Sequence, residues 1–181
     1  MITSASSLQS ALSVYTGNGL VSSGTASSPA AMRILDRKKI PYVVLTYEVK
    51  EFEDGIQIAD LEGVPREESY KTLVLQGKGK AYYVFVLPIE AELDLKAAAR
   101  AAGEKSVEMI HVKDIFTVTG YVRGGCSPLG MKKQYPVFLD ESAGLFSKIY
   151  VSGGRIGSTI RLAPDELLSA CGGKYAPVTM N

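Results

Sequence analysis

Residues 121–133 read Tyr-Val-Arg-Gly-Gly-Cys-Ser-Pro-Leu-Gly-Met-Lys-Lys, with three glycines and one proline inside seven positions. So many glycines and a proline exclude a helix interior or a central strand, and they predict a shaped loop. Residues 119–123 before the loop and 137–139 after it are predicted as strands. Residues 149–157 (Ile-Tyr-Val-Ser-Gly-Gly-Arg-Ile-Gly) also run from a short strand into a Gly-Gly turn. The two glycine corners together predict a pocket rimmed by backbone amides, because bare backbone lets a ligand approach closely.

The composition is that of an ordinary globular domain. The chain has 181 residues, of which 46% are apolar and 22% charged, and its net charge is +1. One domain is therefore expected, with no overall basic field for nucleic acid. Binding one end of an RNA needs only a local patch, and three basic clusters could supply it or be solvated surface: Arg33/Arg37/Lys38/Lys39, Lys78/Lys80 and Lys132/Lys133.

The few cysteines and histidines limit the metal chemistry that is possible and indicate the redox compartment. Two cysteines, Cys126 and Cys171, and the single His111 are too few for a disulfide framework or a cysteine–histidine zinc cluster. We therefore expect chemistry that needs no metal. We also expect the protein to lie in a reducing, cytoplasmic compartment. No apolar run approaches the roughly 20 residues of a membrane span, so no membrane partner is expected.

The first 29 residues are uncharged and contain nine serines. They lack the basic region and the continuous apolar core of a signal peptide. We therefore expect residues 1–27 to be a disordered extension, natural or added for expression. Residues 28–175 are expected to form the single domain, and residues 176–181 a tail.

Helix and strand signals follow one another irregularly through the domain. Ser28 is predicted as an N-cap with Pro29 at the first helical position, and other short helices are predicted at 56–61, 94–103, 114–119 and 164–170. Strands are predicted at 42–47, 70–76, 81–87, 107–111, 137–139, 149–152 and 159–162. Because there is no regular βαβ alternation, a doubly wound sheet is disfavoured. The predicted fold class is mixed α+β, with six or seven strands and interspersed short helices.

Lys71 occupies an informative position in the strand predicted at 70–76. With a side-chain period of two, it shares one face with Leu73 and Leu75. If that face is the core, Lys71 points inward, and a buried ammonium group requires a partner. The alternative is that a lysine near the end of a strand simply extends to water.

Common nucleophile templates are incomplete in this sequence. Cys126 and the single His111 suggest a thiol hydrolase, but no third, orienting group is identifiable. A cysteine among apolar neighbours is more often a small core residue. Ser127 and Ser152 lack the Gly-x-Ser-x-Gly elbow of serine hydrolases. Taken without any family resemblance, the residues indicate a domain with a pocket, but they do not identify a reaction.

Four segments, in order, resemble the YbaK/EbsC family of aminoacyl-tRNA deacylases, which is related to the editing domain of bacterial prolyl-tRNA synthetase. They are Ser28-Pro29-Ala30 with Ile40-Pro41-Tyr42 and Tyr47; Tyr70-Lys71-Thr72-Leu73; Thr119-Gly120-Tyr121 with residues 124–130 and Lys132-Lys133; and residues 149–157. The resemblance covers residues 28–172. The Gly-Gly-x-Ser-Pro-Leu-Gly-x-Lys-Lys form is similar to that of the free-standing Cys-tRNA(Pro) deacylases.

The resemblance implies a compact mixed β-barrel flanked by helices, with no metal and no cofactor. It also implies that Lys71 is the essential lysine, which holds the terminal adenosine or polarises the ester. Tyr47 and Phe52 would close the pocket, and Gly124 and Gly125 would present backbone groups near the scissile ester. The other implied substrate-binding positions are Thr72, Cys126, Ser127, Ser152, Gly153 and Gly154.

The function implied by the resemblance is clearance of Cys-tRNA(Pro) in trans by substrate-assisted cleavage of the aminoacyl ester. The cysteinyl thiol, a positioned water or a ribose hydroxyl attacks, while the protein orients these groups and stabilises the oxyanion. The implied partners are the 3′-terminal adenosine end of aminoacylated tRNA and prolyl-tRNA synthetase. Two alternatives stay open: a non-catalytic binding or regulatory module, and a deacylase for another small amino acid such as alanine.

Overall fold

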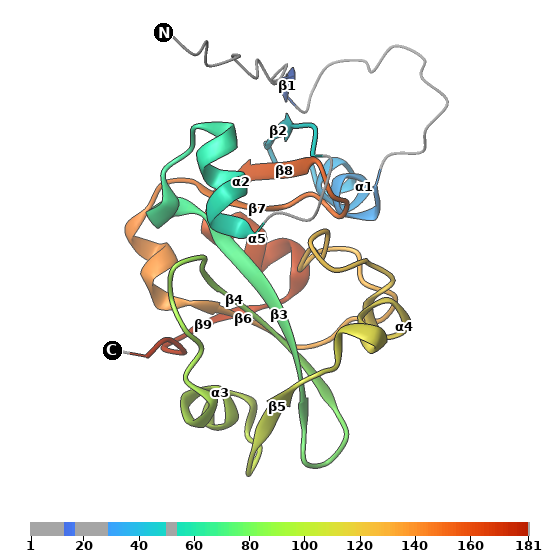
Figure 1. Cartoon of the computed structure of the whole chain (residues 1–181), viewed down its shortest axis with the longest axis vertical. Coiled ribbons are helices and arrows are strands. Elements are labelled where there is room, and N and C mark those ends of the chain that lie inside the picture. Colours follow the sequence, from blue (N-terminus) through green and yellow to red (C-terminus); the bar gives the residue numbers. More distant parts are fainter. Residues whose placement is uncertain (1–12, 17–28, 50–53, 181) are drawn as a thin grey trace, which may run out of the picture.

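The computed structural model describes residues 13–16, 29–49 and 54–180, and the strands within these ranges form two sheets (Figure 1). The first sheet contains, in spatial order, β1 (Ser13–Thr16), β2 (Val43–Thr46), β8 (Ser158–Leu162) and β7 (Ile149–Ser152). The second contains, in spatial order, β5 (Val107–Met109), β3 (Tyr70–Gly77), β4 (Tyr82–Pro88), β6 (Val137–Asp140) and β9 (Lys174–Ala176). The first sheet is antiparallel, whereas β6 of the second runs parallel to both of its neighbours.

The two sheets meet at the start of β3. Ser69 forms a parallel bridge to Tyr150 of β7, and the same edge of β3 pairs with β5 from Leu75 onward. Between these two contacts the edge of β3 at residues 71–73 faces a cavity. This corner gives the fold its barrel-like arrangement, and the predicted α+β class is confirmed.

Short helices flank the sheets, as predicted. In the described ranges the α-helices are α1 (Ala30–Arg37), α2 (Gly55–Glu62), α3 (Leu95–Ala102), α4 (Ile115–Thr119) and α5 (Pro164–Cys171). Asp94 caps α3 by accepting hydrogen bonds from the N–H groups of Lys96 and Ala97, at 2.9 and 3.0 Å. Gly103 ends α3 and Gly120 ends α4 in the left-handed conformation that glycine adopts without strain. The cap signals in the sequence therefore placed these helices correctly.

Two predictions of local structure are wrong. Pro29 has an extended backbone (φ −52°, ψ 150°) and is the N-cap of α1, rather than its first helical residue; Ser28 lies outside the described residues. Residues 119–123 do not form a strand. The Thr119 hydroxyl accepts a hydrogen bond from Tyr121 N–H (3.0 Å), and the Thr119 carbonyl accepts one from Lys132 N–H (2.9 Å). These bonds occupy the Tyr121 N–H and the Thr119 carbonyl, which a strand partner would otherwise use.

The described residues contain nine strands, two of which the sequence did not predict. The additional ones are β1, which lies in the segment expected to be an extension and pairs with β2, and β9, which pairs with β6. Strands of three or four residues carry too little alternation to be recognised before their neighbours are known. The domain boundaries themselves stay a prediction.

Apolar side chains form two cores on the opposite faces of β4. Val84 and Val86 face the main core, which lies between the sheets and includes residues of α1 and α5. Phe85 and Leu87 face a smaller core that contains Ala98 of α3. Burial on both faces confirms that β4 is a central strand.

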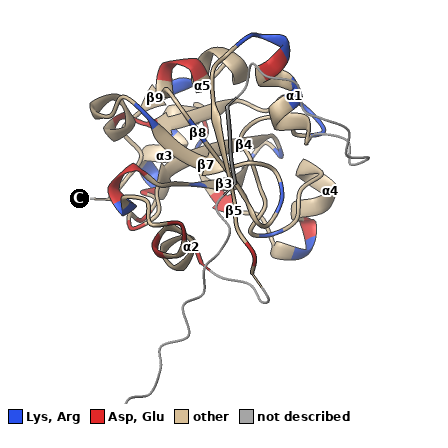
Figure 2. Cartoon of the chain, turned by 90° about the horizontal axis from the view of Figure 1, so that it is seen from above, with Lys and Arg blue, Asp and Glu red and all other residues tan. Residues whose placement is uncertain are grey.

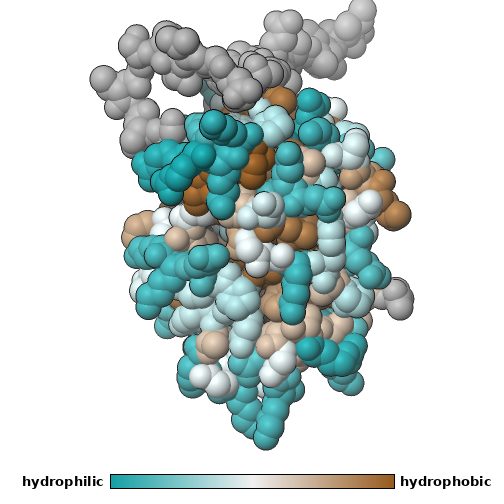
Figure 3. All heavy atoms as spheres, turned by 180° about the vertical axis from the view of Figure 1, so that it is seen from behind, coloured by the Kyte–Doolittle hydropathy of each residue, from teal (hydrophilic) through white to brown (hydrophobic). Residues whose placement is uncertain are grey.

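The surface carries charges of both signs. Figure 2 shows Lys and Arg interspersed with Asp and Glu over the outer elements, and the face in Figure 3 is largely hydrophilic with small separate apolar areas. This distribution agrees with the net charge of +1. Among the described helices, none combines the length and apolar character needed to cross a membrane.

Candidate active site

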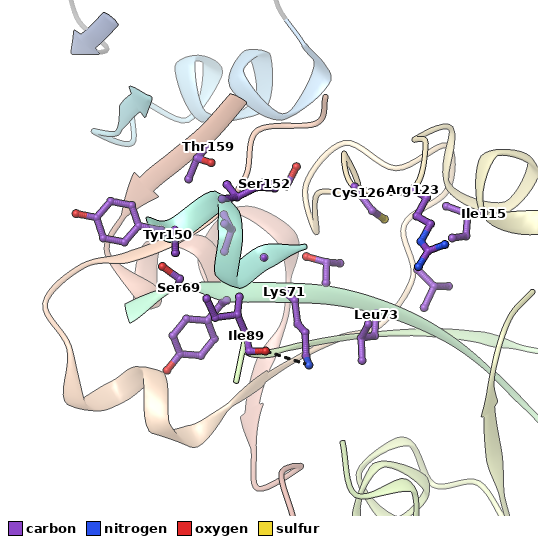
Figure 4. A pocket seen from close by; sticks show the side chains of 18 of the residues that line it. Ser69, Lys71, Leu73, Ile89, Ile115, Arg123, Cys126, Tyr150, Ser152 and Thr159 are labelled. Carbon is purple, nitrogen blue, oxygen red and sulfur yellow. Dashed lines mark hydrogen bonds between the residues drawn. The ribbon is translucent and has the colours of Figure 1, made fainter. Parts of the chain in front are cut away.

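A cavity of about 380 Å³ opens at the corner where the two sheets meet (Figure 4). Its walls come from β3, α2, β7, β8 and the glycine loop that follows α4. Apolar side chains such as Ile58, Leu73 and Ile115 form part of the lining, which is typical of sites for small organic groups. Six of the residues predicted for the site line this cavity: Tyr47, Lys71, Thr72, Gly124, Cys126 and Ser152.

Lys71 is half-buried, and its ammonium group has backbone partners. Nζ donates hydrogen bonds to the carbonyls of Ala91 (2.7 Å) and Ile89 (3.4 Å). Burial lowers the pKa of Lys71, and the nearby Glu92 raises it in part. In Figure 4 the ammonium group lies on the other side of the β3 ribbon from Ser152 and Cys126. The period-two prediction thus placed Lys71 on the leucine face, where carbonyls supply the partner that its burial requires.

Thr72 lines the cavity from the neighbouring position of β3. Its Oγ1 is buried and makes no hydrogen bond with any residue in the described ranges. Buried hydroxyls nearly always have a partner, so an unpartnered one in a cavity wall is available to a ligand. Thr72 therefore provides a donor and an acceptor beside the open edge of β3.

The two glycine corners lie directly against each other. A Cβ atom on Gly125 would stand 2.9 Å from Arg155 Cα and 3.0 Å from Ile156 N. Gly154 has a positive φ of 99°, and its Cα faces the ring of Tyr121 at a distance that leaves little room for a side chain. Gly125 and Gly154 therefore pack the two loops together outside the cavity lining, Gly153 packs on Ser158 of its own hairpin, and Gly124 lines the cavity.

The remaining predicted positions have other surroundings. Ser127 is fully buried outside the cavity lining, and its Oγ accepts a hydrogen bond from Leu129 N–H at 3.2 Å. The hydroxyl of Tyr121 donates to the carbonyl of Leu129. These bonds fix the shape of the glycine loop, which gives Ser127 a supporting position. Phe52 lies outside the described residues.

Cys126 has the properties of a protonated, unreactive thiol. Burial raises its pKa to about 11, although the Thr119 hydroxyl opposes the rise. His111 is exposed and is absent from the cavity lining, so it does not complete a thiol–imidazole pair there. These observations argue against the thiol-hydrolase alternative. In the described part of the chain, no three or more histidine, cysteine or acidic side chains group together as a metal site.

Glu62 is a cavity residue that the sequence analysis did not identify. It is the last residue of α2, its side chain lines the cavity, and only 8% of the residue is exposed. Burial raises its pKa to about 7, with the neighbouring Thr159 hydroxyl opposing the rise. A signal was present in the sequence, because an acidic residue directly before the helix-ending Gly63 is unfavourable for the helix dipole.

Replacing Glu62 with glutamine should increase the free energy of unfolding at alkaline pH but not at acid pH. The folded-state pKa of about 7 lies above the ordinary value of 4.5, so the native state holds the extra proton and wild type loses stability as pH rises between these values. The gain from Glu62→Gln should be about 2 to 3 kcal/mol larger at about pH 8.5 than at about pH 5. Urea unfolding at both pH values measures it. The exposed Glu67→Gln should show no such difference, and an equal gain of Glu62→Gln at both pH values would contradict the assignment.

Comparison with known proteins identifies the family of this chain. Residues 49–170 match the family described as the aminoacyl-tRNA editing domain, and the chain belongs to this family. The prediction from the sequence motifs is thereby confirmed: the protein is an editing enzyme of the deacylase class, and its substrate is an aminoacyl-tRNA.

The chain is also similar to individual relatives and, in its fold, to a solved structure. The chain is 44% identical over 158 residues to an Enterococcus faecalis protein named "Putative Cys-tRNA(Pro)/Cys-tRNA(Cys) deacylase EbsC", covering 86% of this chain and 95% of that one. It is 30% identical over 124 residues to the uncharacterized protein YwhH of Bacillus subtilis, covering 66% and 78%. A crystal structure of "a putative trans-editing enzyme for prolyl tRNA synthetase" shares the fold, with a TM-score of 0.72, 23% identity and coverage of 86% and 100%.

Proposed function

We propose that the protein removes cysteine from mischarged Cys-tRNA(Pro) in trans. The observation that carries this proposal is the 44% identity, over 86% of this chain and 95% of the other, to the Enterococcus faecalis protein named as a putative Cys-tRNA(Pro)/Cys-tRNA(Cys) deacylase. The site supports it chemically: Cys126 is held protonated, with its pKa raised to about 11, so the cavity offers no activated thiol. A reaction in which the substrate supplies its own nucleophile fits such a site.

In the proposed reaction the cysteinyl thiol attacks its own ester carbonyl. A sulfur–carbon bond forms, the bond from that carbon to the terminal ribose oxygen breaks, and the thiol proton passes to the ribose oxygen. The products are tRNA and a cyclic thiolactone, which water opens to cysteine. A water or a ribose hydroxyl is the alternative attacking group. The protein orients the reacting groups and stabilises the developing oxyanion. These are the main ways in which it can accelerate the reaction without a nucleophile of its own.

Individual residues take roles in this reaction by their positions in the cavity. Gly124 presents backbone next to the ester, and Thr72 offers its unpartnered hydroxyl to the substrate. Lys71 supplies the positive charge, and its longer hydrogen bond, 3.4 Å to Ile89 O, is the one that a substrate oxygen would replace. Tyr47 and Ser152 enclose the acyl group. We further propose that prolyl-tRNA synthetase contributes to the choice of tRNA, since this chain has a balanced surface charge.

Release of amino acid from tRNA(Pro) charged separately with cysteine and with alanine tests the proposal. We expect the wild-type protein to release cysteine at least about 10-fold faster than alanine, because only cysteine carries the attacking thiol. Uncatalysed ester hydrolysis in buffer is the control. Faster release of alanine would identify a deacylase for another small amino acid. Binding of the charged tRNA without release of either amino acid would favour a non-catalytic module.

A further inference from the structure

The carboxyl group of Glu62 is poorly explained by the stability of the fold. It lies at the C-terminal end of α2, where the helix dipole disfavours an anion. Its Oε1 is buried and has no hydrogen-bond partner among the residues of the described ranges, and the neighbouring Thr159 hydroxyl is a neutral group that offsets only part of the cost of burial. The salt bridges found in those ranges join Arg66 to Asp60 and Glu90, and none involves Glu62. A carboxyl group placed so unfavourably, and facing a cavity, is expected to serve a ligand.

The surroundings of Glu62 define what this ligand group must be. Ala59 lies one turn earlier on α2, and the cavity near Glu62 is completed by Tyr47 and Thr159. Tyr47 is 7% exposed and its hydroxyl is neutral, since burial raises its pKa further above the ordinary value of 10.0. Thr159 is also neutral and 7% exposed. The best partner for a carboxylate among neutral groups is a small cation that donates several hydrogen bonds.

An aminoacyl ester carries one group of this kind, its α-ammonium. We propose that Glu62 is the specificity residue that binds the α-ammonium group of the aminoacyl substrate. This inference rests on the proposed deacylase function and adds to it the means by which the acyl group is oriented. An ion pair at one end of the acyl group and Gly124 near its carbonyl would fix the ester between them.

Binding of the α-ammonium group by Glu62 would limit the range of substrates. An ester whose amino group is acylated, as in peptidyl-tRNA, places a neutral and larger amide against Glu62, which leaves the buried carboxylate without a cationic partner. The site would therefore act on free aminoacyl esters and spare esters with a blocked amino group. The ester with a blocked amino group would bind weakly because it leaves the carboxylate without a cation. The free aminoacyl ester would in addition be attracted by it.

A cycle of two enzymes and two esters tests the inference. tRNA(Pro) is esterified with cysteine and with 2-hydroxy-3-sulfanylpropanoic acid, in which a hydroxyl replaces only the α-ammonium group and the thiol is kept. The value of kcat/KM is measured for both esters with wild type and with Glu62→Gln. We expect the substitution to lower kcat/KM for the cysteine ester by about 10- to 100-fold and to change it less than about 3-fold for the hydroxy ester. For each ester, kcat/KM of Glu62→Gln is divided by kcat/KM of wild type. The different intrinsic reactivities of the two esters cancel in this ratio.

Three results would overturn the inference. An equal loss on both esters assigns Glu62 to folding or to another part of the substrate, and no loss on the cysteine ester removes it from recognition. In both cases the deacylase function stands. If wild type cleaves neither ester, the proposed function fails and the inference with it. The exposed Glu67→Gln should behave as wild type on both esters, and thermal unfolding of Glu62→Gln verifies that the variant is folded.

Discussion

Replacing Lys71 with alanine should lower kcat/KM for release of cysteine from tRNA(Pro) by at least about 100-fold. Lys71 lines the cavity, and two backbone carbonyls that follow β4 hold its ammonium group on the leucine face of β3. A positive charge in a partly desolvated wall stabilises developing negative charge more strongly than the same charge in water. Single-turnover deacylation with enzyme in excess measures the effect on the chemical step.

The hydrogen bond from Lys71 Nζ to Ala91 O, 2.7 Å long, requires a second variant. Lys71→Met keeps most of the side-chain length and removes the charge, so it separates catalysis from packing. Both substitutions should abolish activity to a similar extent, while Lys96→Ala, at an exposed position on α3, should leave the rate unchanged. If Lys71→Met retained the wild-type rate, the lysine would serve to hold residues 89–91 and would not act on the ester.

Replacing Gly125 with alanine should destabilise the protein by about 1 to 3 kcal/mol and lower the deacylation rate by about 100-fold. The added Cβ would meet the backbone of Arg155 and Ile156 at 2.9 to 3.0 Å. Backbone cannot rotate away as the end of a side chain can, so the two glycine loops must separate. Gly124, which lines the cavity, moves with them. Urea unfolding and the single-turnover rate measure the two effects.

Gly144 offers a matched control for this substitution. It lies in the 3₁₀-helix Glu141–Leu145, where a Cβ would meet nothing within 4 Å. Gly144→Ala should therefore change the free energy of unfolding by less than about 1 kcal/mol and leave the rate unchanged. A wild-type rate in Gly125→Ala would show that contact between the two loops is dispensable for activity.

Much of the fold and part of the site could be predicted because their signals are local. Asp94 and Gly103 marked the ends of α3, and the apolar residues on both faces of β4 identified a central strand. The glycines of the two corners predicted a pocket rimmed by backbone amides; Gly124 lines the cavity, whereas Gly125 packs on Arg155 outside the lining. The family resemblance rested on the same local motifs.

Other features depended on long-range contacts that no local pattern encodes. The predicted strand at 119–123 is absent because Thr119 bonds to Tyr121 and to the distant Lys132. Strands β1 and β9 exist only as partners of β2 and β6. In each case the backbone hydrogen bonds depend on which segment lies alongside, and that depends on the whole fold.

The sequence by itself determined the family, the class of reaction and the face of β3 on which Lys71 lies. It did so because motif residues and strand alternation are properties of neighbouring positions. Only the tertiary structure decided that Lys71 contacts the carbonyls of Ile89 and Ala91, and that Glu62 reaches the same cavity as Thr159. Burial raises the pKa of Glu62 because the fold removes its carboxyl group from water beside Thr159 of β8. A helical glutamate is ordinary in a sequence, and its removal from water by the fold is what makes it a candidate for binding the substrate.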